Sequence, residues 1–372
     1  MIAIGLMSGT SLDGVDAALV EINGKDIKLL NFITLNYDID FKNKIFRNLH
    51  DDTARLSEIS SLNFELGYKF KDAIDEVLKG TNYKYEDIDF VASHGQTIWH
   101  DPHGNPASTF QIGEPSVISY LTNIKTISNF RTMDIAAGGE GAPLVPFSEY
   151  YQFVSDTEDI VLQNIGGISN LTYIKKSSSI DEIVSFDCGV GNIMIDFFVN
   201  RYFNLPYDNN GDIASSGKVI NEIYQALITD EFVKKAPPKS TGREQYSHKF
   251  MLDLEKKLRF HEYKKEDIIT TITEFTVYGI SYNYQKFLGN IDKAVINGGG
   301  SHNKYIIRRL KEILNINVLT GEEFGINSDA KEAVAFVILG YMTLLNEPSN
   351  VVKATGAKEP VILGNITLSP RK

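Results

Sequence analysis

The sequence contains a single cysteine, Cys188, and no long hydrophobic run. One cysteine rules out an intrachain disulfide and makes a cysteine-based zinc site unexpected. The most apolar stretch, residues 333–345, is shorter than the roughly 18 residues that a helix needs to cross a bilayer. Residues 1–5 lack the basic region and long apolar stretch of a signal peptide. We therefore expect a soluble, cytoplasmic protein with no membrane partner.

An excess of positive charge is also absent, because 37 Lys and Arg residues stand against 48 Asp and Glu residues, a net charge of −11. Such a surface repels phosphodiester backbones and argues against nucleic-acid binding, although a single nucleotide needs only a few local donors. No P-loop motif and no protein-kinase motif occurs. Gly298–Gly300 do not extend to a dinucleotide-binding motif, because Asn303 takes the place of its last glycine.

The remaining composition is that of an ordinary globular protein, with 42% hydrophobic and 23% charged residues in 372. This length favours two cores over one. Two β-hairpins are predicted half a chain apart, residues 2–7 with 15–22 and residues 160–165 with 171–174. They hint at a duplicated domain, with coincidence as the alternative.

Apolar spacing predicts the other elements. Helices are expected over residues 56–78, 192–202, 218–227, 266–288 and 329–345, and short buried strands over 88–92, 183–186 and 294–296. Residues 237–243 are expected to form a loop. Strands and helices mixed in both halves of the chain indicate an α/β protein.

Four glycine-rich polar turns follow predicted strands: residues 8–14, 166–170, 187–192 and 297–303. Glycine lets backbone N–H groups approach an anion closely, so several such turns in one chain are typical of a nucleotide site. Asp13 and Asp187 each lie in such a turn, where one carboxylate would act as a base and another would order Mg²⁺. The alternative is that each aspartate only caps a turn or helix.

Several blocks in this order resemble the anhydro-N-acetylmuramic acid kinase family. They are Gly5–Asp16, His94–His100, Asn129–Arg131, Gly141–Pro146, Asn164–Asn170, Pro238–Glu244, Gly298–Asn303 and Lys331–Ala333. Together they extend over nearly the whole chain. The family belongs to the superfamily of sugar kinases, heat-shock chaperones and actin.

The resemblance implies two related actin-like (ribonuclease H-like) domains around an ATP-binding cleft, one of residues 1–128 plus 350–372 and one of 129–349. It implies an ATP-dependent reaction in which water opens the 1,6-anhydro ring of the sugar while the γ-phosphate goes to the freed 6-oxygen. The product is N-acetylmuramic acid 6-phosphate, an intermediate of cell-wall recycling. ATP and Mg²⁺ are the implied cofactors, and a homodimer is left open.

The family's site residues match positions of this sequence. Asp187 matches the catalytic aspartate, and Asp13 or Asp187 would hold Mg²⁺ through water, with no metal ligand certain. The implied ATP-binding residues are Gly9, Thr10, Ser11, Leu12, Asp13, Gly14, Val15, Asp16, Gly189, Gly298, Gly299 and Gly300. Cys188, Val190 and Glu140 depart from the family pattern Asp-Thr-Gly-Pro and Gly-Gly-Gln-Gly.

Sugar-binding residues are expected at Asp13, His94, Gln96, Arg131 and Glu332. Arg131 suits bidentate capture of the lactyl carboxylate. The competing interpretations are a surface arginine, a hydrogen-bonded loop histidine at His94 and a helix-dipole partner at Glu332. The competing functions are a sugar kinase or ATPase of the same fold with another substrate, and a non-catalytic binding protein switched by ATP.

Overall fold

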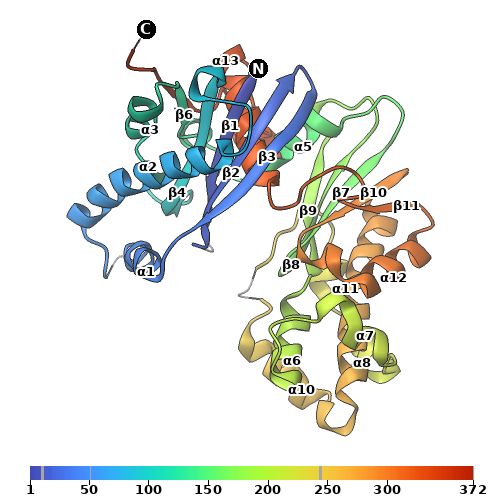
Figure 1. The fold of residues 1–372 in the computed structure, drawn as a ribbon. Helices are drawn as coiled ribbons and strands as arrows, with labels where there is room; N and C mark the ends of the chain where they lie inside the picture. Colours follow the sequence, from blue (N-terminus) through green and yellow to red (C-terminus); the bar gives the residue numbers. More distant parts are fainter. Residues whose placement is uncertain (10–11, 51, 243–244, 372) are drawn as a thin grey trace. The chain divides into compact units, whose positions relative to one another are not determined.

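The computed structural model describes residues 1–9, 12–50, 52–242 and 245–371. They form two compact units, unit 1 of residues 1–152 and 329–372 and unit 2 of residues 153–328. Each unit contains one β-sheet with helices packed on it (Figure 1). The predicted α/β class is confirmed.

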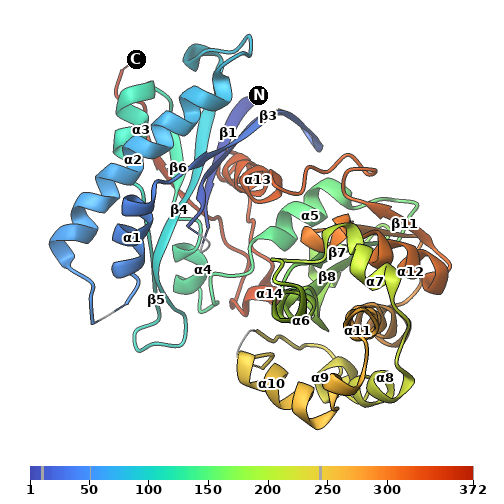
Figure 2. The same cartoon turned by 60° about the horizontal axis from the view of Figure 1, so that its bottom comes forward.

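The sheet of unit 1 has the strand order β12-β6-β4-β1-β2-β3, with β5 paired to β4. Its strands are β1 (Ile2–Ser8), β2 (Gly14–Asn23), β3 (Asp26–Asn36), β4 (Phe90–Asp101), β5 (Ser108–Ile112), β6 (Thr126–Ser128) and β12 (Asn365–Thr367). Its helices of eight or more residues are α1 (Ile39–Arg47), α2 (Leu56–Leu78), α3 (Pro115–Thr122), α5 (Val145–Phe153) and α13 (Lys331–Leu345), and two short ones are α4 (Thr132–Ala136) and α14 (Val352–Thr355). Helices α2 and α3 cover one face of the sheet and α13 the other (Figures 1 and 2).

The sheet of unit 2 has the order β11-β10-β7-β8-β9. Its strands are β7 (Ile160–Ile165), β8 (Ile168–Ile174), β9 (Val184–Val190), β10 (Lys293–Asn297) and β11 (Asn317–Thr320). Its helices are α6 (Ile193–Phe203), α7 (Asp212–Ser216), α8 (Asn221–Leu227), α9 (Glu231–Lys234), α10 (His248–Lys257), α11 (Lys265–Phe287) and α12 (Lys304–Leu314). The long helix α11, most of whose residues are buried, packs against β9, α6, α7, α8 and α12.

The two sheets share one topology. In unit 1, β1, β2 and β3 form an antiparallel meander, and β4 and β6 add to the β1 side in parallel. In unit 2, β7, β8 and β9 form the same meander, and β10 and β11 add to the β7 side in parallel. The two predicted hairpins therefore occupy equivalent positions in two sheets of the same topology.

The sequence-based domain boundaries differ from those of the units. Residues 129–152 and 329–349, which were assigned to the second domain, belong to unit 1. The reason is packing, because α13 lies on β1, β2 and β4. The carboxylate of Asp134 also accepts hydrogen bonds from Asn350 and Thr355 in the C-terminal segment, at 2.8 Å each.

The sequence predicted the long helices and strands well, but two of its predicted turns were wrong. Residues 168–170 and 187–190 are strand rather than turn, since β8 begins at Ile168 and β9 continues to Val190. The ladder pairs Ser169 with Gly189 and Asn170 with Asp187, so Cys188 is an extra residue at a β-bulge. A glycine inside a strand often marks such a bulge, and here it was interpreted as the end of the strand.

Candidate active site

Asp187 lies near the end of β9 and is held by the loop that follows α9. Its Oδ2 accepts hydrogen bonds from the backbone N–H of Thr241 at 2.8 Å and from the hydroxyl of Ser240 at 3.1 Å. The backbone N–H of Asp187 donates to the carbonyl of Lys239 at 3.2 Å. Two consecutive residues of the loop expected at 237–243 thus hold the carboxylate, and the residue before them holds the Asp187 backbone.

The charge state of Asp187 follows from opposing effects. Burial raises the pKa of this carboxyl, while the Thr241 N–H, the Ser240 hydroxyl and the charge of Lys239 lower it. A raised pKa makes the ionised carboxylate a better proton acceptor than an ordinary aspartate. Asp187 can therefore serve as a general base.

Its neighbour Cys188 is fully buried, and burial raises the pKa of its thiol to about 12. The thiol lies 3.8 Å from Oε1 of Gln163. A buried thiol that stays protonated is inert, so Cys188 fills space beside the base and is no nucleophile. The replacement of the family's threonine by Cys188 leaves the carboxylate in place.

The glycines after Asp187 allow neighbouring side-chain and backbone atoms to pack closely against the chain. Gly189 has φ +133°, and a Cβ there would lie 2.9 Å from Cγ2 of Val233. At Gly191 a Cβ would lie 2.2 Å from the carbonyl oxygen of Gly166. The N–H groups of Gly191 and Asn192 already donate to carbonyls of the 166–167 turn, at 2.9 and 2.7 Å. These N–H groups are therefore occupied within the protein.

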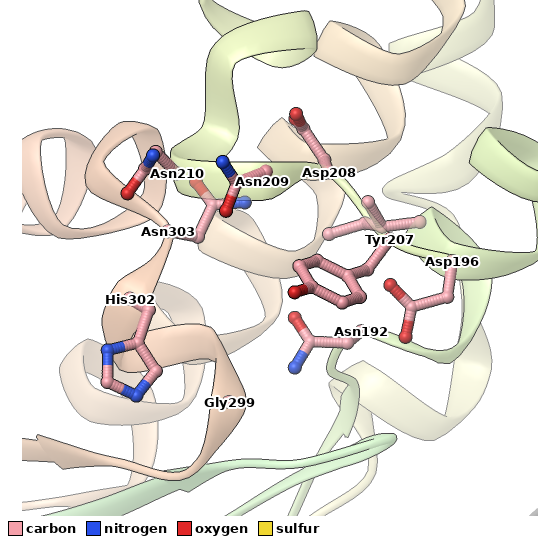
Figure 3. Close-up of a pocket in the computed structure, with 10 residues that line it drawn as sticks. Asn192, Asp196, Tyr207, Asp208, Asn209, Asn210, Gly299, His302 and Asn303 are labelled. Carbon is pink, nitrogen blue, oxygen red and sulfur yellow. The ribbon is translucent and has the colours of Figure 1, made fainter. Parts of the chain in front are cut away.

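A pocket of about 470 Å³ opens in unit 2 beside the glycine turn of residues 297–303. Gly299 lines it, from the short helix that follows β10. Its other lining residues are Asn192, Ile195, Asp196, Tyr207, Asp208, Asn209, Asn210, His302 and Asn303. Asn192, Asp196 and Tyr207 lie on one side and His302 on the other (Figure 3). Polar amides with one tyrosine ring suit a nucleoside.

Two aspartates line this pocket and differ in role. Asp208 accepts backbone hydrogen bonds from Ile213 and Ala214, at 2.9 and 3.0 Å, and so ties the pocket to the start of α7. Asp196 lies on α6, and burial together with the charge of Asp208 raises its pKa to about 6. Of these lining residues only Gly299 was named as ATP-binding, while Asn192, His302 and Asn303 lie in two of the predicted glycine-rich turns. The polar run 208–212 was the signal in the sequence that was overlooked.

In unit 1, the first glycine turn lies between β1 and β2. Thr10 and Ser11 lie outside the described residues. Leu12 has φ +58° and is buried, and its N–H donates to the carbonyl of Gly9 at 3.2 Å. Asp13 is exposed and forms an ion pair with Lys42 at 3.2 Å. At Gly14 a Cβ would lie 2.2 Å from the carbonyl oxygen of Leu35, so β3 requires glycine here.

Asp16 and Glu332 are two partly buried carboxylates of unit 1. Asp16 lies on β2 after the buried Val15 and accepts a hydrogen bond from the Thr34 hydroxyl at 2.6 Å. Glu332 lies in the first turn of α13. Burial raises the pKa of both carboxyls, and the charge of Asp16 raises that of Glu332 further, while Lys331 and Arg131 lower it.

Arg131 and His94 are hydrogen-bonded to each other. Nε of Arg131 donates to Nε2 of His94 at 2.9 Å, and Nη1 donates to the carbonyl of Gly141 at 2.7 Å. Nδ1 of His94 therefore carries the ring proton, which it donates to the carbonyl of Gly95 at 2.9 Å. Burial and the charge of Arg131 lower the pKa of His94 to about 3, so the ring is neutral. His94 orients the guanidinium, and both of its own nitrogens are occupied.

Gln96 is also occupied within the protein. It is fully buried on β4, and its Oε1 accepts a hydrogen bond from the Ser8 hydroxyl at 2.7 Å. Ser8 is in turn 2.9 Å from the hydroxyl of Tyr37. Gln96 therefore holds Ser8, the last residue of β1 before the first glycine turn. The competing interpretation placed His94 on a loop, but both side chains lie in a strand.

The donor set for a metal is sparse. Among the described residues, no group of three or more His, Cys, Asp or Glu side chains could hold a metal ion. Mg²⁺ keeps several waters and binds phosphates, so one carboxylate acting through water suffices. Asp13 and Asp187 fit this outer role, and the ion would neutralise phosphate charge. Nor do the described residues include a helix long and apolar enough to cross a membrane.

The anhydro-N-acetylmuramic acid kinase family model matches residues 1–369. The chain belongs to this family. A curated anhydro-N-acetylmuramic acid kinase from Clostridioides difficile (strain 630) is 49% identical over 381 residues, covering 100% of this chain and 99% of the relative. One from Bacillus thuringiensis subsp. konkukian (strain 97-27) is 47% identical over 383 residues, covering 100% of both. The resemblance stated from the motifs is thereby confirmed.

A solved xylulose kinase from Lactobacillus acidophilus with bound ligand is similar to this chain at 10% identity, with a TM-score of 0.45, over 97% of this chain and 94% of that one. The activator of a 2-hydroxyisocaproyl-CoA dehydratase from Clostridium difficile has 12% identity and a TM-score of 0.44, over 90% and 92%. Similarity at this level supports no conclusion about the site of this anhydro-N-acetylmuramic acid kinase family member.

Proposed function

We propose that this protein is an ATP-dependent kinase that hydrolytically opens 1,6-anhydro-N-acetylmuramic acid and phosphorylates it to N-acetylmuramic acid 6-phosphate. The observation that carries this proposal is full-length membership of the family, residues 1–369, in a chain whose Asp187 is an oriented carboxylate. Kinases or ATPases with other substrates, and ATP-switched binding proteins, are not favoured.

Unit 2 supplies the base and a nucleotide site in this proposal. Asp187 removes a proton from water as the water attacks the anomeric carbon, where positive charge develops in the transition state. The pocket next to Gly299 takes the nucleoside of ATP, and the turn of Gly298–Gly300 lies where its phosphates begin. Gly189 lies at the bulge of β9 and stays a predicted ATP-binding residue.

Unit 1 supplies the sugar-binding side chains and the first phosphate loop. The residues proposed for it, Gly9 to Asp16, include the first three residues of β2, and Asp13 orders Mg²⁺ or the sugar. Arg131 takes the lactyl carboxylate, because its guanidinium is fixed on one side by His94 and Gly141. Glu332 accepts from sugar hydroxyls. His94 and Gln96 are positioning residues, since their polar atoms are already engaged.

The cofactors in this proposal are ATP and Mg²⁺, the ion serving only to neutralise phosphate charge and orient the nucleotide. ATP dependence places the reaction in the cytoplasm. A net charge of −11 remains the argument against nucleic acid as a partner. A homodimer stays a prediction, which sedimentation of the purified protein measures directly.

The deciding experiment is the reaction in ¹⁸O-labelled water. Water attacking opposite the leaving oxygen must invert the anomeric carbon, and the anhydro bridge is β. We expect the label at the anomeric hydroxyl and the α-anomer of the 6-phosphate first, by mass spectrometry and rapid-quench NMR. Label in the phosphate, or the β-anomer first, would contradict this mechanism. ADP release without the sugar would favour a plain ATPase.

A further inference from the structure

Lys239 is a buried lysine in the loop between α9 and α10. Its ammonium group donates hydrogen bonds to the carbonyls of Phe232 and Val233, at 3.1 and 2.9 Å. Both carbonyls belong to the short helix α9. Lysine is seldom fully buried, and a buried ammonium group needs specific compensation. The two carbonyls provide part of it.

Three aromatic rings provide the rest. The Nζ of Lys239 lies 5.1 Å from the ring centroid of Phe232, 5.4 Å from that of Phe287 and 5.6 Å from that of Phe186. These rings come from α9, α11 and β9, and the rings of Phe186 and Phe287 pack edge to face. A cation within about 6 Å of an aromatic face is attracted by the ring quadrupole, more strongly when desolvated. The ammonium group is thus enclosed in a cage of rings.

The cage is connected to the proposed general base, Asp187, along the chain and by hydrogen bonds. Phe186 precedes Asp187 in β9, and the Lys239 carbonyl accepts the Asp187 N–H. The two residues after Lys239 are Ser240 and Thr241, the donors to Oδ2 of Asp187. Immobilising the Lys239 head group therefore fixes the backbone from which both donors extend.

We propose that Lys239 is a positioning residue for the reaction, whose caged ammonium group locks residues 239–241 so that they aim the Asp187 carboxylate. This inference rests on the proposed function, in which Asp187 is the base. A loosened loop would let the carboxylate rotate away from the attacking water. Misplacing a reacting group by about 1 Å costs on the order of 100-fold in rate.

The test compares Lys239→Met, which keeps the length and apolar stem, with Lys239→Arg, which keeps a cation that stacks on rings. We expect Lys239→Met to lower kcat roughly 10- to 100-fold, with the KM for the sugar and the Kd for ADP within about twofold of wild type. Lys239→Arg should recover part of that loss. Lys235→Met, at an exposed lysine in the same loop, is the matched control and should leave kcat unchanged.

If Lys239 had a purely structural role, its replacement would lower the stability of the protein without lowering kcat selectively. The distinguishing measurement is a double-mutant cycle that combines Lys239→Met with Asp187→Asn. If Lys239 acts only through the base, Lys239→Met should change kcat little in a protein that already carries Asp187→Asn. Independent losses that multiply would overturn the inference. So would a folded Lys239→Met with wild-type kcat, or a loss shared equally by kcat and ADP affinity.

A second variant covers the case in which Lys239→Met does not fold. Phe287→Leu removes one ring of the cage from α11 and leaves the lysine in place, so kcat should fall several-fold with ADP affinity retained. Unchanged kcat there would overturn the inference. Wild type that releases no ADP in response to the sugar would overturn the proposed function and this inference with it. Active wild type with unaffected variants overturns the inference alone.

Discussion

At the scale of single residues, hydrogen-bonding partners distinguish the proposed base from the side chains that hold others in place. Asp187 presents an oriented carboxylate, whereas His94 and Gln96 have their polar atoms engaged by Arg131, Gly95 and Ser8. A histidine kept neutral by burial accepts a hydrogen bond from an arginine without repelling it. His94 therefore sets the direction of the guanidinium and carries no charge.

The residue-scale prediction concerns the pH dependence of the base. Only ionised Asp187 accepts a proton, and burial raises its pKa, so kcat/KM should fall as the pH is lowered through a value above that of an ordinary aspartate. Asp187→Asn should reduce turnover by ~10²-fold or more and abolish this acid limb. Steady-state ADP release between neutral and acidic pH measures both.

The control for this prediction is ADP affinity. Calorimetry should find the Kd for ADP unchanged in Asp187→Asn, because the pocket lined by Asn192, Tyr207 and His302 is untouched. Turnover within a few-fold of wild type, or an unchanged acid limb in a folded variant, would remove Asp187 from the role of base.

At the scale of elements, one buried carboxylate joins two segments that are distant in sequence. Asp134 on α4 accepts hydrogen bonds from the Gly141 N–H at 2.7 Å and from Asn350 and Thr355 at 2.8 Å each. A Cβ at Gly139 would lie 2.3 Å from Oδ2 of Asp134, so the loop closes tightly over it. This loop ends at Gly141, whose carbonyl holds Arg131.

The element-scale prediction is that Asp134→Ala destabilises unit 1 and impairs sugar binding. Hydrogen bonds to a charged group contribute about 1.5–3 kcal/mol each, and their donors would be left unpaired. We expect a loss of about 3 kcal/mol or more in the free energy of unfolding, and a higher KM for the sugar. Urea denaturation and steady-state kinetics test it. Asp52→Ala, at an exposed aspartate, should change neither.

At the scale of the whole molecule, two copies of one topology differ in how the chain builds them. Unit 2 is a single segment, residues 153–328, with its own buried core. Unit 1 needs two segments, because α13 from the C-terminal part lies on β1 and β4. The pocket next to Gly299 lies wholly within unit 2.

The whole-molecule prediction is that residues 153–328 expressed alone fold cooperatively and bind ADP without catalysing the reaction. Residues 1–152 alone should not fold, since the sheet would expose the surface that Phe336, Val337 and Leu339 of α13 cover. Circular dichroism during heating and calorimetry with ADP measure these outcomes. An unfolded 153–328 fragment, or one that does not bind ADP while the full chain does, would contradict the prediction.

The sequence by itself determined the α/β class, the family and the long elements. Apolar spacing over a long helix such as α2 depends only on neighbours along the chain, so it can be read without the fold. The motif blocks also singled out Asp187, Arg131 and Glu332 by residue type and order.

Only the tertiary structure decided what those residues contact. The bulge at Cys188, the neutral state of His94, the pocket residues Asn192 and Tyr207, and the cage around Lys239 all depend on partners far away in sequence. Strand pairing and desolvation are set by such partners, and no local pattern encodes them. The domain boundaries were misplaced for the same reason, because packing assigned α13 to unit 1.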